Sequence, residues 1–308
     1  LQNNLTPVLV DAEKGTYNIN VDLIESQITK KTKGIVLAHT LGNPFDLDKI
    51  TKLANKYDLF LMEDMCDAFG STFKGKNVGT FGDVATLSFY PAHHITTGEG
   101  GAVLTSNTKL KKIIESLRDW GRDCYCPPGK DNTCKKRFDW QLGNLPPGYD
   151  HKYIYSHIGY NLKATDMQAA IGISQLNKLE NFISVRRENF SYLYSKFENF
   201  NEFDLPVWHK DANPSWFGFP LMLNDNAKFI REDLLKFYQE RKIGTRLLFA
   251  GNITKQPAYI NSSISTNQEF PIADQIMNNA FWLGVYPGLN FEMLDFIVTE
   301  TKNFLKDT

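Results

Sequence analysis

The sequence has few of the features that mark secreted or membrane proteins. It has four cysteines among 308 residues and no apolar signal-like stretch near its beginning, so a small disulfide-stapled fold is excluded. Its longest apolar run, residues 59–62, is far shorter than the roughly 18 residues that a membrane-spanning helix needs. The formal charge is −1, from 34 Lys and Arg against 35 Asp and Glu, which is unlike a nucleic-acid-binding protein. We therefore expect a globular protein of the reducing cytoplasm that binds neither membranes nor nucleic acid.

Short apolar runs alternate with amphipathic segments in the first hundred residues. Residues 6–11, 34–39 and 58–63 are apolar and end in a polar residue, which is typical of buried parallel strands covered on both faces. Residues 22–29 and 46–57 have the spacing of amphipathic helices. This order predicts an α/β domain whose ligands bind beyond the carboxyl ends of the strands. Two further strands are predicted at residues 84–90 and 101–105.

The character of the sequence changes after residue 118. Residues 119–160 are rich in Gly, Pro, Cys, Asp and aromatic residues without a period, and irregular segments of this length are usually functional or held by a ligand. A long helical period follows, with Thr165 and Asp166 as its predicted cap. The later predicted elements and the domain boundary are a helix over 164–197, a strand over 216–223, helices over 227–241 and 291–305, and a boundary near 185–200.

Two groups of residues carry candidate chemistry at predicted strand ends. Glu63 and Asp64 end the third apolar run, where a carboxylate can pair with a cationic ring nitrogen or a metal; a helix cap or a solvated acid is the plainer alternative. Residues 88–101 contain hydroxyls, two imidazoles and several glycines, which suits a turn where backbone approaches a ligand and a histidine moves a proton. A histidine held only for structural reasons is the alternative there.

The four cysteines form a third group. Cys124, Cys126 and Cys134 lie in the irregular segment, and a bound metal would explain how such a loop stays ordered. Together with Cys66 they supply four thiolates, which suit tetrahedral zinc or a 2Fe-2S cluster equally well. Zinc sites usually use pairs two to four residues apart, so the spacing favours the cluster. Four unrelated free thiols are the remaining alternative.

Several motifs occur together in this chain: Glu63 with Asp64, residues 69–71, 79–83, Ser88 with Phe89, 98–101, 159–161 and 165–170. In combination they resemble the DegT/DnrJ/EryC/StrS sugar aminotransferase family of pyridoxal-phosphate enzymes. The resemblance implies the fold-type I, aspartate aminotransferase-like architecture: a three-layer α/β/α large domain over residues 1–190 and a smaller C-terminal α+β domain over 191–308. It also implies a homodimer.

The resemblance also implies roles for the matched residues. Asp64 would pair with the protonated pyridine nitrogen of the cofactor, and Ser88 would bind its phosphate, helped by Asn161 from a neighbouring subunit. Asp67 occupies a position near the ring hydroxyl of the cofactor.

One departure from the family pattern concerns the catalyst. Family aminotransferases have a Schiff-base lysine five residues after the serine, where this chain has His93. Imidazole cannot replace that amine, but it can move a proton at neutral pH. The exchange is similar to that in the sugar 3-dehydrases of the family, which use pyridoxamine phosphate to remove a hydroxyl, and it makes His93 the predicted catalytic residue.

The cysteine spacing resembles the iron–sulfur branch of these dehydrases. That branch implies a 2Fe-2S cluster on Cys66, Cys124, Cys126 and Cys134, a CDP-linked 4-keto-6-deoxyhexose as substrate, and an NADH-dependent flavin/iron–sulfur reductase as partner. Two alternatives stay open: a cluster-free enzyme like GDP-4-keto-6-deoxymannose 3-dehydratase, and a zinc-stapled binding protein without catalysis.

The start of the chain gives one more expectation. The family places a phosphate-binding turn, a residue that stacks on the cofactor ring and the first strand in its N-terminal part, and none of these precedes Leu1. We therefore expect the large domain to be truncated at its N-terminus, with an incomplete cofactor pocket and weak cofactor affinity.

Overall fold

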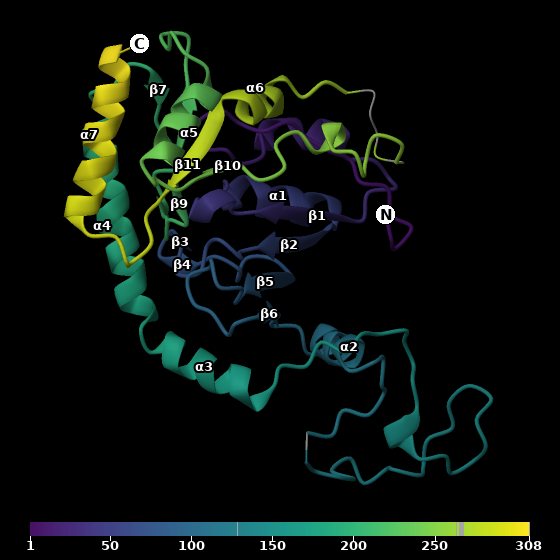
Figure 1. Cartoon of the computed structure of the whole chain (residues 1–308). Helices are drawn as coiled ribbons and strands as arrows, with labels where there is room; N and C mark the ends of the chain where they lie inside the picture. Colours follow the sequence, from purple (N-terminus) through teal and green to yellow (C-terminus); the bar gives the residue numbers. More distant parts are fainter. Residues whose placement is uncertain (128, 263, 265–267, 308) are drawn as a thin grey trace.

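The computed structural model describes residues 1–127, 129–262, 264 and 268–307, and its strands form three sheets (Figure 1). The first sheet has the order β1-β2-β5-β6. Its strands β1 (Gly34–Ala38), β2 (Phe60–Asp64) and β5 (Val84–Ser88) are parallel, and β6 (Gly101–Leu104) is antiparallel to β5. Parallel neighbours end at the same edge of a sheet, so the ends of β2 and β5 lie side by side. The strands predicted at 34–39, 58–63, 84–90 and 101–105 are confirmed.

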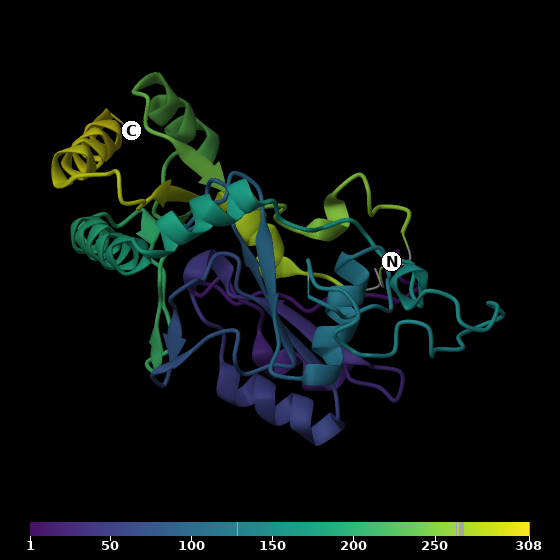
Figure 2. The same cartoon turned by 90° about the horizontal axis from the view of Figure 1, so that it is seen from below.

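Helix α1 (Leu47–Tyr57) covers one face of this sheet (Figure 2). The side chain of Asp46 caps it by accepting the N–H of Lys49 at 3.0 Å, which satisfies a backbone donor that the helix leaves unpaired. Leu47 and Ile50 are fully buried in the core cluster that also contains Leu61 of β2. The helix predicted over residues 46–57 is therefore confirmed.

Two predictions for the N-terminal residues are wrong. Residues 6–11 form no strand, and Val8 is 53% exposed. The segment instead extends to the C-terminal half of the molecule. There the carboxylate of Asp11 accepts the N–H groups of Ile272 (3.0 Å) and Ala273 (2.9 Å) in the first turn of α6 (Pro271–Asn279). Residues 22–29 form two short 3-10 turns instead of an α-helix, because so short a segment does not sustain one alone.

The C-terminal half is built on a second, antiparallel sheet. Its order is β10-β11-β9-β7, and its hydrophobic core extends from Phe190 to Phe304. The third sheet, β4-β3-β8, pairs residues of both halves. The elements are β3 (Thr72–Phe73), β4 (Lys76–Asn77), β7 (Phe203–Asp204), β8 (Ala212–Asn213), β9 (Gly218–Leu223), β10 (Thr245–Leu247), β11 (Ala280–Gly284), α5 (Arg231–Glu240) and α7 (Phe291–Asp307). The strand predicted over 216–223 and the helices over 227–241 and 291–305 are confirmed.

The helical period over residues 164–197 forms two consecutive helices, α3 (Asp166–Leu176) and α4 (Leu179–Phe197). Thr165 and Gln168 form a capping box at the start of α3, which confirms the predicted cap. Helix α4 packs its buried side, including Phe190 and Leu193, on the core of the C-terminal half.

The irregular segment lies between α2 (Thr108–Arg118) and α3 and extends away from the sheets in both views (Figures 1 and 2). An ion pair between Arg137 and Asp150, at 2.6 Å, and a stack of His151 on Trp140 hold parts of it together. Among all described helices, none has the length and apolar character needed to cross a membrane.

Candidate functional site

Four of the predicted site residues lie around the carboxyl ends of β2 and β5. Asp64 is the last residue of β2 and lies opposite Thr86 of β5 in the sheet register. Its carboxylate accepts the backbone N–H of Cys66 at 3.0 Å. Within the described residues Asp64 forms no ion pair with Lys, Arg or His, so this half-buried negative charge is available to a cationic ligand.

Ser88 ends β5, and the chain returns to β6 through a closed loop. Two backbone hydrogen bonds close the loop: the N–H of Phe89 donates to Gly100 at 2.9 Å, and the N–H of Thr97 donates to Phe89 at 3.0 Å. The hydroxyl oxygen of Ser88 accepts the N–H of Tyr90 at 3.2 Å. The hydroxyl hydrogen of Ser88 therefore stays available for an anion such as a phosphate.

His93 lies in this loop and contacts Asp67. Its Nδ1 lies 3.3 Å from Oδ1 of Asp67, and the two side chains are 17% and 15% exposed. The contact has ion-pair distance without hydrogen-bond angles, so Nδ1 has no hydrogen-bond partner in the described structure. Catalytic hydrogen bonds are often misaligned before the ligand binds. A small rotation would let Nδ1–H donate to Asp67, and Nε2 would then be the free basic nitrogen.

Glu63 lies in the interior on the other side of the strand. Its side chain is fully buried, and each carboxylate oxygen is near two nitrogens. Oε1 accepts from Phe81 (2.8 Å) and Gly82 (2.7 Å), while Oε2 accepts from Gly79 (2.7 Å) and lies 3.2 Å from Nε2 of His39. Of the predicted carboxylate pair, only Asp64 belongs to the site; Glu63 anchors the turn at residues 79–82.

The C-terminal half contributes a residue that the sequence did not predict. The ring of Phe217 lies 5.2 Å from the imidazole of His93, and its backbone N–H donates to Leu41 at 2.9 Å. Phe217 directly precedes β9 and is far from His93 in sequence, so no local pattern connects the two. The only available signal was the aromatic character of the run at 216–219.

Asn161 is not brought to these residues within the described chain. It is exposed and forms an isolated bridge with Asp119, just after α2. Its predicted contribution to a neighbouring subunit stays a prediction.

The four cysteines are divided between two places. Cys124, Cys126 and Cys134 line a cavity of about 640 Å³ beside α2, and Cys66 is not part of its lining. The thiol of Cys66 instead lies 3.8 Å from the hydroxyl of Thr86, and burial together with Asp64 raises the pKa of Cys66 to about 12. In the part of the chain that the structure describes, no group of three or more His, Cys, Asp or Glu has an arrangement that could hold a metal ion. The predicted cluster on the four cysteines therefore stays a prediction.

Comparison with protein families and curated proteins gives consistent results. The profile of the DegT/DnrJ/EryC1/StrS aminotransferase family matches residues 1–302. The chain is 56% identical to the lipopolysaccharide biosynthesis protein RfbH of Salmonella typhimurium, covering 99% of this chain and 70% of that protein. It is 52% identical to the dTDP-4-dehydro-2,6-dideoxy-D-glucose 3-dehydratase of Saccharopolyspora spinosa, covering 99% of this chain and 66% of that protein. The chain thus spans about two thirds of the length of these relatives.

Comparison with solved structures gives the same fold. The structure resembles E. coli GDP-4-keto-6-deoxy-D-mannose-3-dehydratase with bound hydrated PLP, at a TM-score of 0.85 and 29% identity. The match covers 97% of this chain and 75% of that one. This confirms the predicted fold-type I architecture.

Proposed function

The chain belongs to the DegT/DnrJ/EryC1/StrS aminotransferase family, and from this premise we propose that it removes the 3-hydroxyl group of a nucleotide-linked 4-keto-6-deoxyhexose as water, using pyridoxamine 5′-phosphate. The observation that carries the proposal is the presence of a histidine, His93, at the position of the family's lysine. It stands five residues after Ser88, where family aminotransferases have their lysine, and it lies beside Asp67 at the end of the central strands. Two similar proteins, one in sequence and one in structure, are named as sugar 3-dehydratases.

The residues at this strand edge fit the cofactor. Asp64 offers an unpaired carboxylate for the protonated ring nitrogen, and Ser88 offers a hydroxyl for the phosphate. When bound, pyridoxamine phosphate supplies a primary amine for the keto group of the sugar and an aromatic ring that accepts electrons. Asp64 keeps that ring electron-poor by stabilising its positive charge.

His93 supplies the proton transfer. Asp67 lies 3.3 Å from Nδ1 of the imidazole and would accept its hydrogen after a small rotation. Nε2 would then take a proton from the methylene carbon of the bound cofactor, so that the hydroxyl at carbon 3 of the sugar could leave. An imidazole beside a carboxylate is suited to this because it accepts and returns protons near neutral pH. A lysine at this position would hold the cofactor covalently and favour amino transfer instead.

The finer features of the proposal rest on the sequence resemblance. We propose a CDP-linked sugar in 3,6-dideoxysugar and lipopolysaccharide O-antigen biosynthesis, in the cytoplasm, and a homodimer in which Asn161 reaches the phosphate of the neighbouring subunit. The relationship to a lipopolysaccharide biosynthesis protein supports this pathway.

The 2Fe-2S cluster and the NADH-dependent flavin/iron–sulfur reductase are also proposals from the cysteine spacing. In the described structure Cys66 does not line the cavity of the three loop cysteines. Reconstitution with iron and sulfide tests the cluster: a 2Fe-2S spectrum that is lost on replacing any one cysteine supports it, whereas a colourless zinc protein refutes it.

One alternative stays open, a dehydratase that works without a cluster. Absence of iron from an active protein would establish it. A zinc-stapled binding protein, in contrast, would show neither the absorption band of bound pyridoxamine phosphate nor any turnover.

The reaction itself is tested with purified protein, pyridoxamine phosphate and 4-keto-6-deoxyhexoses linked to CDP, dTDP or GDP. We expect mass spectrometry to show a 3-deoxy sugar that has lost one oxygen atom, formed fastest from the CDP sugar. The hydroxyl leaves as water, and the two electrons of the broken methylene C–H bond stay with the sugar while the cofactor is oxidised to pyridoxal phosphate. An amino sugar as the main product would contradict the proposed dehydration. Equal or faster turnover of another nucleotide sugar would contradict only the choice of nucleotide.

A further inference from the structure

The segment that carries Phe217 is held by buried polar groups that the proposed chemistry does not use. Arg186 of α4 is 3% exposed, and its Nη1 donates to the carbonyls of Trp216 (3.3 Å) and Phe217 (3.2 Å). His94 holds the residue before them, with Nε2 at 3.0 Å from the carbonyl of Ser215. Burial and the charge of Arg186 lower the pKa of His94 to about 3, so His94 is neutral and donates this hydrogen bond.

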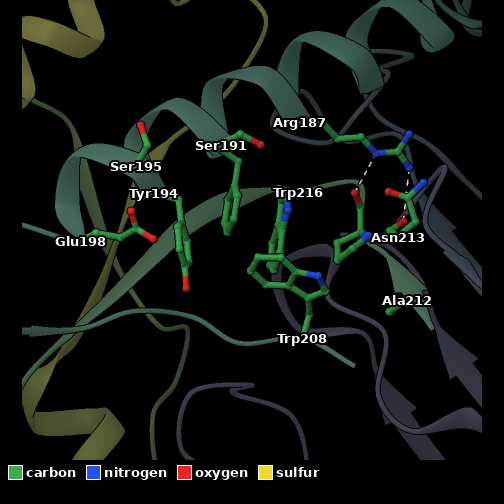
Figure 3. Close-up of a pocket in the computed structure, with 11 residues that line it drawn as sticks. Arg187, Ser191, Tyr194, Ser195, Glu198, Trp208, Ala212, Asn213 and Trp216 are labelled. Carbon is green, nitrogen blue, oxygen red and sulfur yellow. Dashed lines mark hydrogen bonds between the residues drawn. The ribbon is translucent and has the colours of Figure 1, made fainter. Parts of the chain in front are cut away.

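The next residue of helix α4, Arg187, also binds this segment. Figure 3 shows the guanidinium of Arg187 beside Asn213, and its Nε donates to the carbonyl of Pro214 at 2.9 Å. Two successive arginines therefore bind consecutive parts of the segment 213–217. A helix of the C-terminal half fixes how this segment meets the loop of His93.

Burying the charged guanidinium of Arg186 costs free energy, which is a high cost if its only role is to hold a backbone segment in place. Burial lowers its pKa to about 10, and it forms no ion pair with any carboxylate in the described part of the chain. The negative charge that acts on it is that of Asp67, the partner of His93. Its guanidinium also lies over the ring of Phe217, 5.8 Å from the ring centre. One buried cation thus faces two of the groups that contact His93.

We propose that Arg186 is a positioning residue for His93: by holding the carbonyls of Trp216 and Phe217, it fixes the Phe217 ring against the imidazole and so orients the group that transfers the proton. This inference rests on the proposed role of His93. The packed ring limits rotation of the imidazole and shields one of its faces from water, while Asp67 lies 3.3 Å from Nδ1. Proton transfer needs this orientation because small misplacements of a catalytic group lower rates steeply.

NMR of the cofactor-free protein tests this directly, because the ring of Phe217 shifts the signals of a neighbouring imidazole. The His93 signals are assigned as those lost in His93→Asn. In Phe217→Leu they should move by the lost ring effect, and in Arg186→Met they should move in the same direction. Arg231→Met is the matched control, since Arg231 is also buried and donates to two carbonyls, those of Met277 (2.6 Å) and Ala280 (3.1 Å). It should lower stability without moving the His93 signals.

The second measurement is hydrogen exchange at the methylene carbon of added pyridoxamine phosphate. Arg186→Met should slow it about ten- to a hundredfold, and Arg231→Met should leave it unchanged. Unmoved His93 signals or an unchanged exchange rate in folded Arg186→Met would overturn the proposal. If Arg186→Met does not fold, Arg186→Gln is measured in the same way; failure of both to fold while Arg231→Met folds would assign Arg186 a structural role only. Absence of exchange in the unaltered protein would refute the proposed function itself, and the NMR comparison remains interpretable in that case.

Discussion

The two neighbouring carboxylates at the end of β2 have different roles, one in stabilising the fold and one in binding a ligand. Glu63 is buried and accepts three backbone hydrogen bonds, whereas Asp64 is half-buried and has no cationic partner in the described chain. Successive residues of a strand point to opposite faces, so this division follows from the strand itself. A buried charge with several donors stabilises the fold, and an unpaired charge at a strand end is suited to a ligand.

Replacing Glu63 with Gln tests the structural task. Each oxygen of Glu63 faces two nitrogens, so either orientation of the Gln amide would set its NH2 group against N–H donors. We expect the free energy of unfolding at pH 7 to fall by about 1–3 kcal/mol, measured by urea denaturation. The exposed Glu292→Gln is the control and should change it by less than about 0.5 kcal/mol. Equal effects of the two substitutions would contradict the anchor role of Glu63.

The same carboxylate gives a pH dependence. Burial alone raises the pKa of Glu63, but hydrogen bonds from His39, Gly79 and Gly82 outweigh it and hold the pKa below its usual range. A carboxyl group with a lowered folded-state pKa stabilises the fold above its unfolded pKa of about 4.3 and loses this contribution as the pH falls. The stability difference between the unaltered protein and Glu63→Gln should therefore shrink below about pH 4. A difference that is constant from pH 7 to pH 3 would contradict this.

Replacing Asp64 with Asn tests whether Asp64 binds the cofactor. Asn can still accept the N–H of Cys66, so the cofactor-free protein should keep its stability within about 0.5 kcal/mol. Pyridoxamine phosphate at 100 times its dissociation constant should stabilise the unaltered protein by about 2.7 kcal/mol and raise its melting temperature. At the same concentration Asp64→Asn should show a much smaller rise. An equal rise in both proteins would remove Asp64 from the cofactor site.

At the scale of elements, two helix starts were predicted from local signals. The start of α1 at Asp46 was predicted from helical spacing and that of α3 from the cap at Thr165, whereas α2 was not predicted although Asn107 caps it. The N-terminal run 6–11 has the composition of a strand, but no neighbouring strand pairs with it in the described structure. Its role is tertiary, since Asp11 caps the distant helix α6, and a local pattern does not encode such a contact.

The cap of α6 can be tested against the cap of α1. Phe270, at the N-cap position of α6, makes no side-chain cap bond, so Asp11 supplies the carboxylate at this helix end. Asp11→Ala should lower the free energy of unfolding by about 1–2 kcal/mol, at least as much as Asp46→Ala at α1. Chemical denaturation of both variants measures this. A neutral Asp11→Ala beside a destabilising Asp46→Ala would show that the long-range cap contributes nothing.

At the scale of the whole molecule, the site depends on contacts between distant parts of the chain. The positions of Asp64, Ser88 and His93 could be predicted because they follow strand ends or match a family motif. Phe217 and Arg186 could not, because they are placed near His93 only by the packing of α4 and the start of β9 against the loop that carries His93. The cysteine spacing predicted one shared site, yet the described structure separates Cys66 from the irregular segment.

The proposal that His93 takes a proton from the cofactor is tested most directly by hydrogen exchange at the methylene carbon of pyridoxamine phosphate, followed with isotopically labelled cofactor. The unaltered protein should catalyse it, and His93→Asn should slow it by about a hundredfold or more. His209→Asn is the control, because His209 also lies near a carboxylate, 3.9 Å from Asp211, but outside the site. The His209→Asn protein should catalyse the exchange at the rate of the unaltered protein. Exchange in His93→Asn at the rate of the unaltered protein would contradict the account.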